Sequence, residues 1–143
     1  MDNKQIVGYT AGAFDTFHVG HLNLLRRAKE HCDFLIVGVT SDELILRTKG
    51  HLPIISLEDR MKILSAIRYV DKVVVQDDLD KVAAWEKYHY DVLFSGDDWK
   101  GTDRWKGYED ELKKRGAEVV YFSYTKEISS TKIKEMISES SEK

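Results

Sequence analysis

Residues 12–21, Gly-Ala-Phe-Asp-Thr-Phe-His-Val-Gly-His, constrain the fold more than any other part of the chain. Apolar residues at 6–10 precede them, as in a short buried strand, and residues 22–29 carry apolar side chains at helical spacing. The segment is therefore predicted to be a strand-to-helix turn, where α/β proteins present ligand sites. Its glycines permit a ligand to approach the backbone closely, and His18 and His21 lie one helical turn apart. Together with the free amides of a helix N-terminus, this pattern indicates a phosphate site.

The rest of the chain alternates between short apolar runs and helical patterns. Strands are predicted at residues 5–10, 34–39, 70–75, 91–96 and 118–122. Helices are predicted at residues 19–31, 41–49, 56–68, 83–88, 107–115 and 131–137, with Ser41 and Ser56 as N-caps and Gly116 as a C-cap. This alternation implies right-handed crossovers and a Rossmann-like, doubly wound sheet of about five parallel strands with helices on both faces. Residues 1–143 are expected to form one domain, with a frayed tail at 138–143.

Composition limits the kinds of partner and the cellular compartment that we expect for this chain. A length of 143 residues suits one domain with a real core, and the net charge of -3 gives no attraction to nucleic acid or an anionic membrane. A single cysteine, Cys32, excludes an internal disulfide framework and fits a reducing compartment. No apolar run approaches the roughly 18 residues of a membrane span, and the polar N-terminus does not resemble a signal peptide. We therefore expect a cytoplasmic protein with no nucleic-acid or membrane partner.

Three polar segments follow predicted strands and should meet at one edge of the sheet. They are residues 12–21, the Gly-Asp-Asp-Trp segment 96–99, and the hydroxyl-rich segment 124–131. Ligands of open parallel sheets bind at the carboxyl ends of the strands. Lys49 and Arg60 come after the second strand, where cationic side chains would neutralise a polyphosphate.

Four motifs in order resemble those of the small cytidylyltransferases in the nucleotidyltransferase superfamily. They are His-Val-Gly-His at 18–21, Arg-Tyr-Val-Asp at 68–71, Gly-Asp-Asp-Trp at 96–99 and Ile-Ser-Ser-Thr-Lys-Ile at 128–133. The nearest family is the bacterial glycerol-3-phosphate cytidylyltransferases, which supply teichoic acid and related glycans. The resemblance implies transfer of CMP from CTP to a small phosphorylated alcohol, with glycerol 3-phosphate favoured. It also implies direct in-line attack with pyrophosphate as the leaving group, Mg²⁺ carried on the triphosphate, and a homodimer.

The resemblance also implies roles for individual residues. His18, His21 and Lys49 would be catalytic, and Arg60, Arg68 and Asp71 would either bind the acceptor or brace the helices beneath it. Asp15 would orient the site or the metal, with no other protein ligand expected for Mg²⁺. The residues expected to bind the nucleotide are Ala13, Phe14, Asp15, Gly20, Asp97, Tyr124, Thr125, Ser129 and Ser130.

The chain departs from the family pattern at two places. Tyr124 stands where the family has an arginine, and a phenol cannot supply a guanidinium fork. The helix after the third strand lacks the tryptophan-plus-lysine pattern associated with glycerol phosphate. Another acceptor (phosphocholine, phosphoethanolamine or a sugar phosphate), ATP in place of CTP, and a non-catalytic nucleotide-binding sensor therefore remain open.

Several of these residues also have purely structural interpretations. Lys49 followed by Gly50 equally resembles a helix C-terminus, and Trp105 is as consistent with packing as with ligand contact. Asp97 could begin a turn, and Ser129 could cap a helix.

Overall fold

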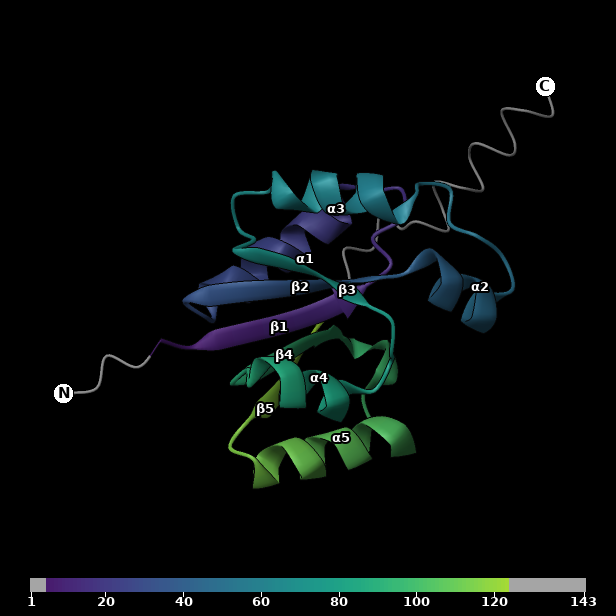
Figure 1. Ribbon diagram of the computed structural model, residues 1–143. Coiled ribbons are helices and arrows are strands. Elements are labelled where there is room, and N and C mark those ends of the chain that lie inside the picture. The colour runs from purple at the N-terminus through teal and green to yellow at the C-terminus, as the bar shows by residue number, and fades with distance from the viewer. Residues whose placement is uncertain (1–4, 124–143) are drawn as a thin grey trace.

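The computed structural model describes residues 5–123, which are built around a parallel sheet. Its strands are β1 (Val7–Gly12), β2 (Phe34–Thr40), β3 (Lys72–Gln76), β4 (Val92–Gly96) and β5 (Glu118–Phe122). The five strands lie in the order β3-β2-β1-β4-β5, and every pairing is parallel (Figure 1). The predicted α/β class is confirmed, and β1, which leads into the histidine turn, occupies the centre of the sheet.

Helices cover both faces of the sheet. In Figure 1, α1 (Val19–Glu30) and α3 (Leu57–Ser65) lie above it, while α4 (Lys81–Tyr88) and α5 (Asp103–Lys114) lie below. Alternation along β2 explains the two layers, because Leu35 and Val37 pack in the first core and Ile36 in the second. The short helix α2 (Asp42–Lys49) follows the carboxyl end of β2. The strand order thus reverses at β1, and a ligand site is expected at that switch point.

Helix termini follow the local sequence signals. Ser41 accepts the Leu44 amide at 3.1 Å and Ser56 accepts the Asp59 amide at 3.4 Å, so both predicted N-caps are confirmed. Gly50 ends α2 with a φ of 79°, and Gly116 follows α5 with a φ of 84°, a left-handed conformation that favours glycine. The Lys49–Gly50 pair forms the C-terminus of α2, with Lys49 as the last residue of the helix.

The boundaries of several elements differ from the prediction by a few residues. β1 spans Val7–Gly12 instead of residues 5–10, and β3 begins at Lys72 instead of residue 70. α3 ends at Ser65, three residues before its predicted end, because a series of turns follows it. These turns bond the amides of Ala66, Ile67 and Val70 to carbonyls three residues earlier.

The largest correction concerns α5, which begins at Asp103 and not near residue 107. Thr102 caps it by accepting the Trp105 amide at 3.4 Å. Trp105 is 6% exposed and packs against Tyr108 with ring centroids 5.4 Å apart, so this tryptophan belongs to the core. A 3₁₀ turn, η1 (Asp97–Trp99), occupies the first part of the segment predicted as a loop.

Cys32 has the structural role expected of it. Its thiol donates to the carbonyl oxygen of Ala28 at 3.3 Å and packs against the core below α1. Burial raises the pKa of this thiol, which opposes formation of a nucleophilic thiolate. The predicted helix at 131–137 and the tail at 138–143 lie outside the described residues.

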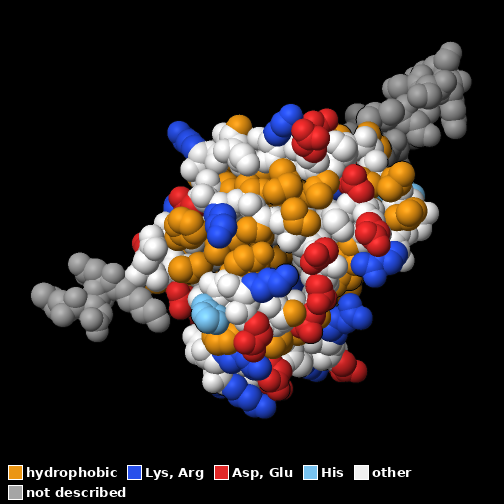
Figure 2. All heavy atoms as spheres, in the orientation of Figure 1, with side chains coloured by type: hydrophobic (Ala, Val, Ile, Leu, Met, Phe, Trp, Pro, Cys, Tyr) orange, Lys and Arg blue, Asp and Glu red, His pale blue; other side chains and the backbone are white. Residues whose placement is uncertain are grey.

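The surface gives two further observations. Acidic and basic side chains are interspersed over the face shown in Figure 2, without a basic stripe across it. Within residues 5–123, no helix is both long enough and apolar enough to cross a membrane.

Candidate active site

The turn after β1 has an unusual backbone that places its side chains. Phe14 and Thr16 adopt left-handed conformations, with φ angles of 51° and 50°, which L-residues other than glycine seldom occupy. Phe14 is 6% exposed and anchors the turn in the core beneath α1. Asp15, between these two residues, is 5% exposed. The turn therefore buries a phenylalanine and an aspartate at successive positions and leads directly into the histidine pair.

His18 and His21 form a reciprocal pair at the start of α1. His18 is the N-cap and accepts the Gly20 amide on Nδ1 at 3.0 Å, while His21 accepts the His18 amide on Nδ1 at 3.2 Å. The two rings stack with centroids 4.0 Å apart, and the Phe17 ring also stacks with His21, at 5.3 Å. The predicted convergence of the two imidazoles is confirmed, and capping is part of how it is achieved.

These hydrogen bonds assign the tautomer of each neutral ring. Because each Nδ1 accepts a backbone N–H, each ring hydrogen lies on Nε2. Nε2 of His18 is buried and has no hydrogen-bond partner within the described part of the chain. An unpartnered buried donor is costly unless a ligand satisfies it. The pair therefore presents a donor suited to an oxygen of an anionic ligand.

Burial keeps both rings neutral near pH 7. It lowers the pKa of His21 to about 4, and the neighbouring His18 ring acts in the same direction, while Asp15 opposes the shift. Burial also lowers the pKa of His18. The rings therefore act near neutral pH as hydrogen-bond donors, while the amides at the start of α1 contribute partial positive charge.

Asp15 connects the turn to the segment after α2. Its Oδ2 accepts the Ile54 amide at 2.9 Å, and its Oδ1 accepts the Ile55 amide at 2.9 Å and the Thr16 amide at 3.1 Å. Within residues 5–123, no group of three or more acidic, histidine or cysteine side chains could hold a metal ion. Asp15 therefore holds backbone segments together through its carboxylate. Within residues 5–123 it belongs to no cluster of side chains that could bind a metal ion.

Arg60 is the largest fully buried side chain in the described structure and binds four oxygens. It donates to the carbonyl oxygens of Ile55 at 2.9 Å, Ala13 at 2.8 Å and Thr40 at 2.7 Å, and it pairs with the carboxylate of Asp42. Of the two roles expected for Arg60, the structure supports bracing, because each guanidinium nitrogen donates to a protein oxygen and the side chain is 0% exposed.

Asp71 and Arg68 lie away from the histidines. Asp71 precedes β3 and accepts the Leu35 amide at 2.8 Å and the Lys29 ammonium at 2.6 Å, both at the amino end of β2. Arg68 is exposed and places its guanidinium 5.2 Å from the Tyr69 ring centre. The expected acceptor-binding role is not supported for either residue, because the histidine turn lies at the opposite, carboxyl edge of the sheet.

Two other predicted residues do reach the carboxyl edge. Lys49 ends α2 with an exposed side chain, five residues before the amide of Ile54 that Asp15 accepts. Asp97 and the 53% exposed Trp99 follow β4 in η1. Ala13 and Gly20 belong to the histidine turn itself, whereas Tyr124, Thr125, Ser129 and Ser130 lie outside the described residues.

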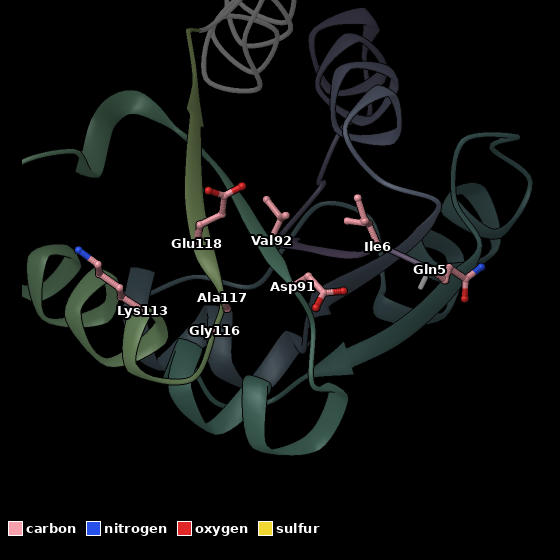
Figure 3. A pocket seen from close by; sticks show the side chains of 8 residues that line it. All are labelled: Gln5, Ile6, Asp91, Val92, Lys113, Gly116, Ala117 and Glu118. Carbon is pink, nitrogen blue, oxygen red and sulfur yellow. The ribbon is translucent and has the colours of Figure 1, made fainter. Parts of the chain in front are cut away.

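A cavity of about 490 Å³ lies at the opposite edge of the sheet (Figure 3). Its lining comes from the amino ends of β1, β4 and β5 and from the end of α5, and comprises Gln5, Ile6, Asp91, Val92, Lys113, Gly116, Ala117 and Glu118. Two carboxylates and one ammonium line it, so the cavity lacks the positive potential that a polyphosphate requires. We therefore place the candidate active site at the histidine turn.

Sequence reasoning missed the backbone groups that organise this site. The amides of Ile54 and Ile55 and the carbonyls of Ala13 and Thr40 are partners of Asp15 or Arg60. No side-chain pattern marks a backbone group, and these partners lie 20 to 47 residues away in the chain. The burial of Asp15 between two left-handed residues became visible only in three dimensions.

A doubly wound sheet with paired histidines capping the helix after its central strand defines the nucleotidyltransferase class. The family model for cytidylyltransferase-like proteins matches residues 9–136, and the chain belongs to that family and is an enzyme. It is 38% identical over 141 residues to the glycerol-3-phosphate cytidylyltransferase of Bacillus subtilis, covering 94% of this chain and 97% of that protein.

Two other comparisons cover a smaller share of this chain. The chain is 47% identical over 68 residues to the ethanolamine-phosphate cytidylyltransferase of Arabidopsis thaliana, covering 47% of this chain and 16% of that protein. The crystal structure of a lipopolysaccharide core biosynthesis protein from Thermoplasma volcanium superposes with a TM-score of 0.73 at 25% identity, covering 85% of this chain and 98% of the other. The fold and the family are therefore shared well beyond the histidine motif.

Proposed function

We propose that this enzyme transfers CMP from CTP to sn-glycerol 3-phosphate and releases CDP-glycerol and pyrophosphate. The observation that carries the choice of acceptor is the likeness to a glycerol-3-phosphate cytidylyltransferase over 97% of that protein's length. A second such relative, from Staphylococcus aureus, is 38% identical over 133 residues. The product would supply glycerol phosphate units to teichoic acid or a related glycan.

The reaction needs no nucleophile from the protein. A phosphate oxygen of the acceptor forms a bond to the α-phosphorus of CTP, and the bond from that phosphorus to the bridging oxygen breaks in line with it. The electron pair of the broken bond leaves with pyrophosphate. Catalysis then consists of positioning the two substrates and stabilising charge on the transferring phosphoryl group.

The histidine pair is suited to that stabilisation. Nε2–H of His18 would donate to a phosphoryl oxygen, with the N-terminus of α1 adding positive potential. His21 would support the same charge, and Lys49 would hold phosphate from the side of α2. Mg²⁺ bound to the triphosphate would neutralise part of the charge on the leaving group.

Other substrates remain alternatives, and each has a specific motivation. The partial likeness to an ethanolamine-phosphate cytidylyltransferase favours phosphoethanolamine as the second candidate acceptor. Tyr124, in place of the family's arginine, keeps ATP under consideration as the nucleotide. A non-catalytic nucleotide sensor is disfavoured by the complete His18–His21 pair, which a sensor would not need.

The experiment is a measurement of pyrophosphate release over a grid of nucleotides and acceptors. CTP and ATP are each combined with glycerol 3-phosphate, phosphocholine, phosphoethanolamine and a sugar phosphate in the presence of Mg²⁺. We expect the highest kcat/KM with CTP and glycerol 3-phosphate. A higher value with another pair would reassign the substrates, and nucleotide binding without release by any pair would favour the sensor.

We also propose that the enzyme works as a homodimer, as expected from the family resemblance. Sedimentation equilibrium at micromolar concentration would give twice the mass of 16.5 kDa if this is correct. A monomer that remains fully active at the same concentration would contradict it.

A further inference from the structure

Asp15 has a set of partners that a substrate-binding carboxylate would not need. Three backbone amides donate to it at 2.9 to 3.1 Å, and two of these belong to Ile54 and Ile55, about 40 residues further along the chain. The side chain is 5% exposed, so these contacts are made away from solvent. One buried carboxylate therefore joins the histidine turn to the segment that follows Lys49.

Arg60 links the same two segments, but through their carbonyl groups. It donates to the carbonyl of Ala13, within the turn, and to the carbonyl of Ile55. Asp15 accepts the amides of residues 54 and 55, whereas Arg60 donates to carbonyls, so the two side chains use different backbone groups of one segment. We call residues 50–55 the Lys49 segment, because they connect that lysine to the anchored amides.

We infer that Asp15 is a positioning residue, which anchors the Lys49 segment against the histidine turn and does not bind nucleotide or Mg²⁺. The inference rests on the proposed function for its kinetic consequence, but the anchoring itself is a property of the unliganded protein. Both carboxylate oxygens already accept backbone amides from the segment. Oδ1 accepts two backbone amides and Oδ2 accepts one, so three of the roughly four acceptor sites of the carboxylate are used by the protein's own backbone.

The anchor matters because the Lys49 segment has few other fixed points. Gly50 is left-handed and exposed, and Leu52 and Ile54 are each 61% exposed, so their side chains contribute little packing. The left-handed backbones of Phe14 and Thr16 aim the Asp15 carboxylate at the segment. Without the carboxylate, the amides of Ile54 and Ile55 lose their acceptor and the segment gains conformational freedom.

The test compares Asp15→Asn with a matched control, Asp33→Asn. An amide at position 15 replaces one accepting oxygen with an NH₂ group that faces a donor. Asp33 also accepts a distant backbone amide, that of Ile6 at 2.8 Å, but at the amino edge of the sheet. Amide hydrogen exchange is measured in both unliganded variants, and kinetics are measured with the best substrate pair from the grid.

In Asp15→Asn, the amides of Ile54 and Ile55 should exchange at least about tenfold faster. Values of kcat/KM should fall about 10- to 100-fold, as expected for a small misplacement of a catalytic group. The Mg²⁺ concentration that gives half-maximal rate should be unchanged. Asp33→Asn should leave both exchange at these amides and kcat/KM near wild type.

Unchanged exchange at Ile54 and Ile55, or a large increase in the Mg²⁺ requirement, would overturn the inference. If Asp15→Asn does not fold, Pro53→Gly loosens the same segment without changing charge, and faster exchange there must be accompanied by a lower kcat/KM. If the grid finds no active substrate pair, the proposed function fails, while the exchange measurement still decides whether the anchor exists.

Discussion

His18 uses its two ring nitrogens for different purposes. Nδ1 caps α1 by accepting the Gly20 amide, and Nε2 is buried without a partner in the described structure. Asparagine is a strong N-cap whose oxygen can replace Nδ1, but it has no equivalent of Nε2–H. We expect His18→Asn to keep Tm within about 2 °C. The same variant should lower kcat by about 10²- to 10³-fold, the loss typical of one transition-state donor.

Thermal unfolding and pyrophosphate release check this prediction, with His18→Ala as the comparison. Alanine removes the cap as well as the donor, so it should lose about 1 kcal/mol of stability in addition to turnover. An asparagine variant that works at the wild-type rate would show that the imidazole serves only as a cap.

The depressed pKa of His21 predicts how stability depends on pH. The pKa is about 4 in the folded protein, whereas a histidine in the unfolded chain has its ordinary value of 6.5, so between these values the unfolded chain binds more protons. Stability from this group is present in full above about pH 6.5 and is lost as pH falls toward 4. The loss is on the order of 3 kcal/mol at most.

Urea unfolding across this pH range measures the effect against His21→Asn, which does not titrate there. The difference in unfolding free energy, wild type minus variant, should decrease as the solution becomes more acidic. A difference that stays constant would mean that His21 has the same pKa in the folded and unfolded states.

At the scale of the element, the start of α5 depends on one hydroxyl. Thr102 caps the helix and also donates to the Trp99 carbonyl at 2.8 Å, so it links η1 to α5. Thr102→Ala should lower the unfolding free energy by about 1 kcal/mol, whereas Thr102→Ser should retain it. Thr48→Ala is the control, because the Thr48 hydroxyl donates only to carbonyls within α2. Chemical denaturation of the three variants measures the difference, and equal losses at both positions would contradict the capping role.

Elements were predicted well where their signals are local. Ser41, Ser56 and Gly116 terminate helices through contacts within a few residues, so the signal and its effect lie in the same short stretch of sequence. The start of α5 was missed because Trp105 resembled a ligand-contacting aromatic in a polar loop. Its place in the core depends on Tyr108 and Tyr121, whose rings lie 5.4 and 6.0 Å away.

At the scale of the whole molecule, Arg60 joins four segments through one side chain. Its partners follow β1, end β2, begin α2 and precede α3. Arg60→Met should lower the unfolding free energy by about 3 kcal/mol or more, because three buried carbonyls and a carboxylate lose their donor.

Arg115→Met is the control for this prediction. Arg115 also makes several polar contacts, to Glu86 and Glu111, but on the surface, and it should cost less than about 1 kcal/mol. Denaturant unfolding compares the two variants. Similar losses would mean that Arg60 does not brace the fold more than a surface arginine does.

The class of fold and the histidine pair were predictable from sequence, whereas the backbone partner of Asp71 was not. The pairing of His18 with His21 depends on residues three apart, so a helical turn suffices to bring them together. Asp71 was predicted at the acceptor side, yet it accepts the Leu35 amide at the amino edge, 36 residues back in the chain. The position of Asp71 near the start of the predicted third strand indicates the amino edge of a parallel sheet, but no local pattern identifies the distant amide that its carboxylate accepts.

The sequence by itself determined the succession of strands and helices, the caps that end them, and the turn that carries the two imidazoles. These features arise from backbone preferences and side-chain spacings within a few residues. Only the tertiary structure decided that β1 is central, that Asp15 accepts the amides of Ile54 and Ile55, and that Arg60 is a buried brace. Those outcomes depend on which distant backbone groups are left without partners when the sheet and its helices pack, and that is a property of the assembled chain.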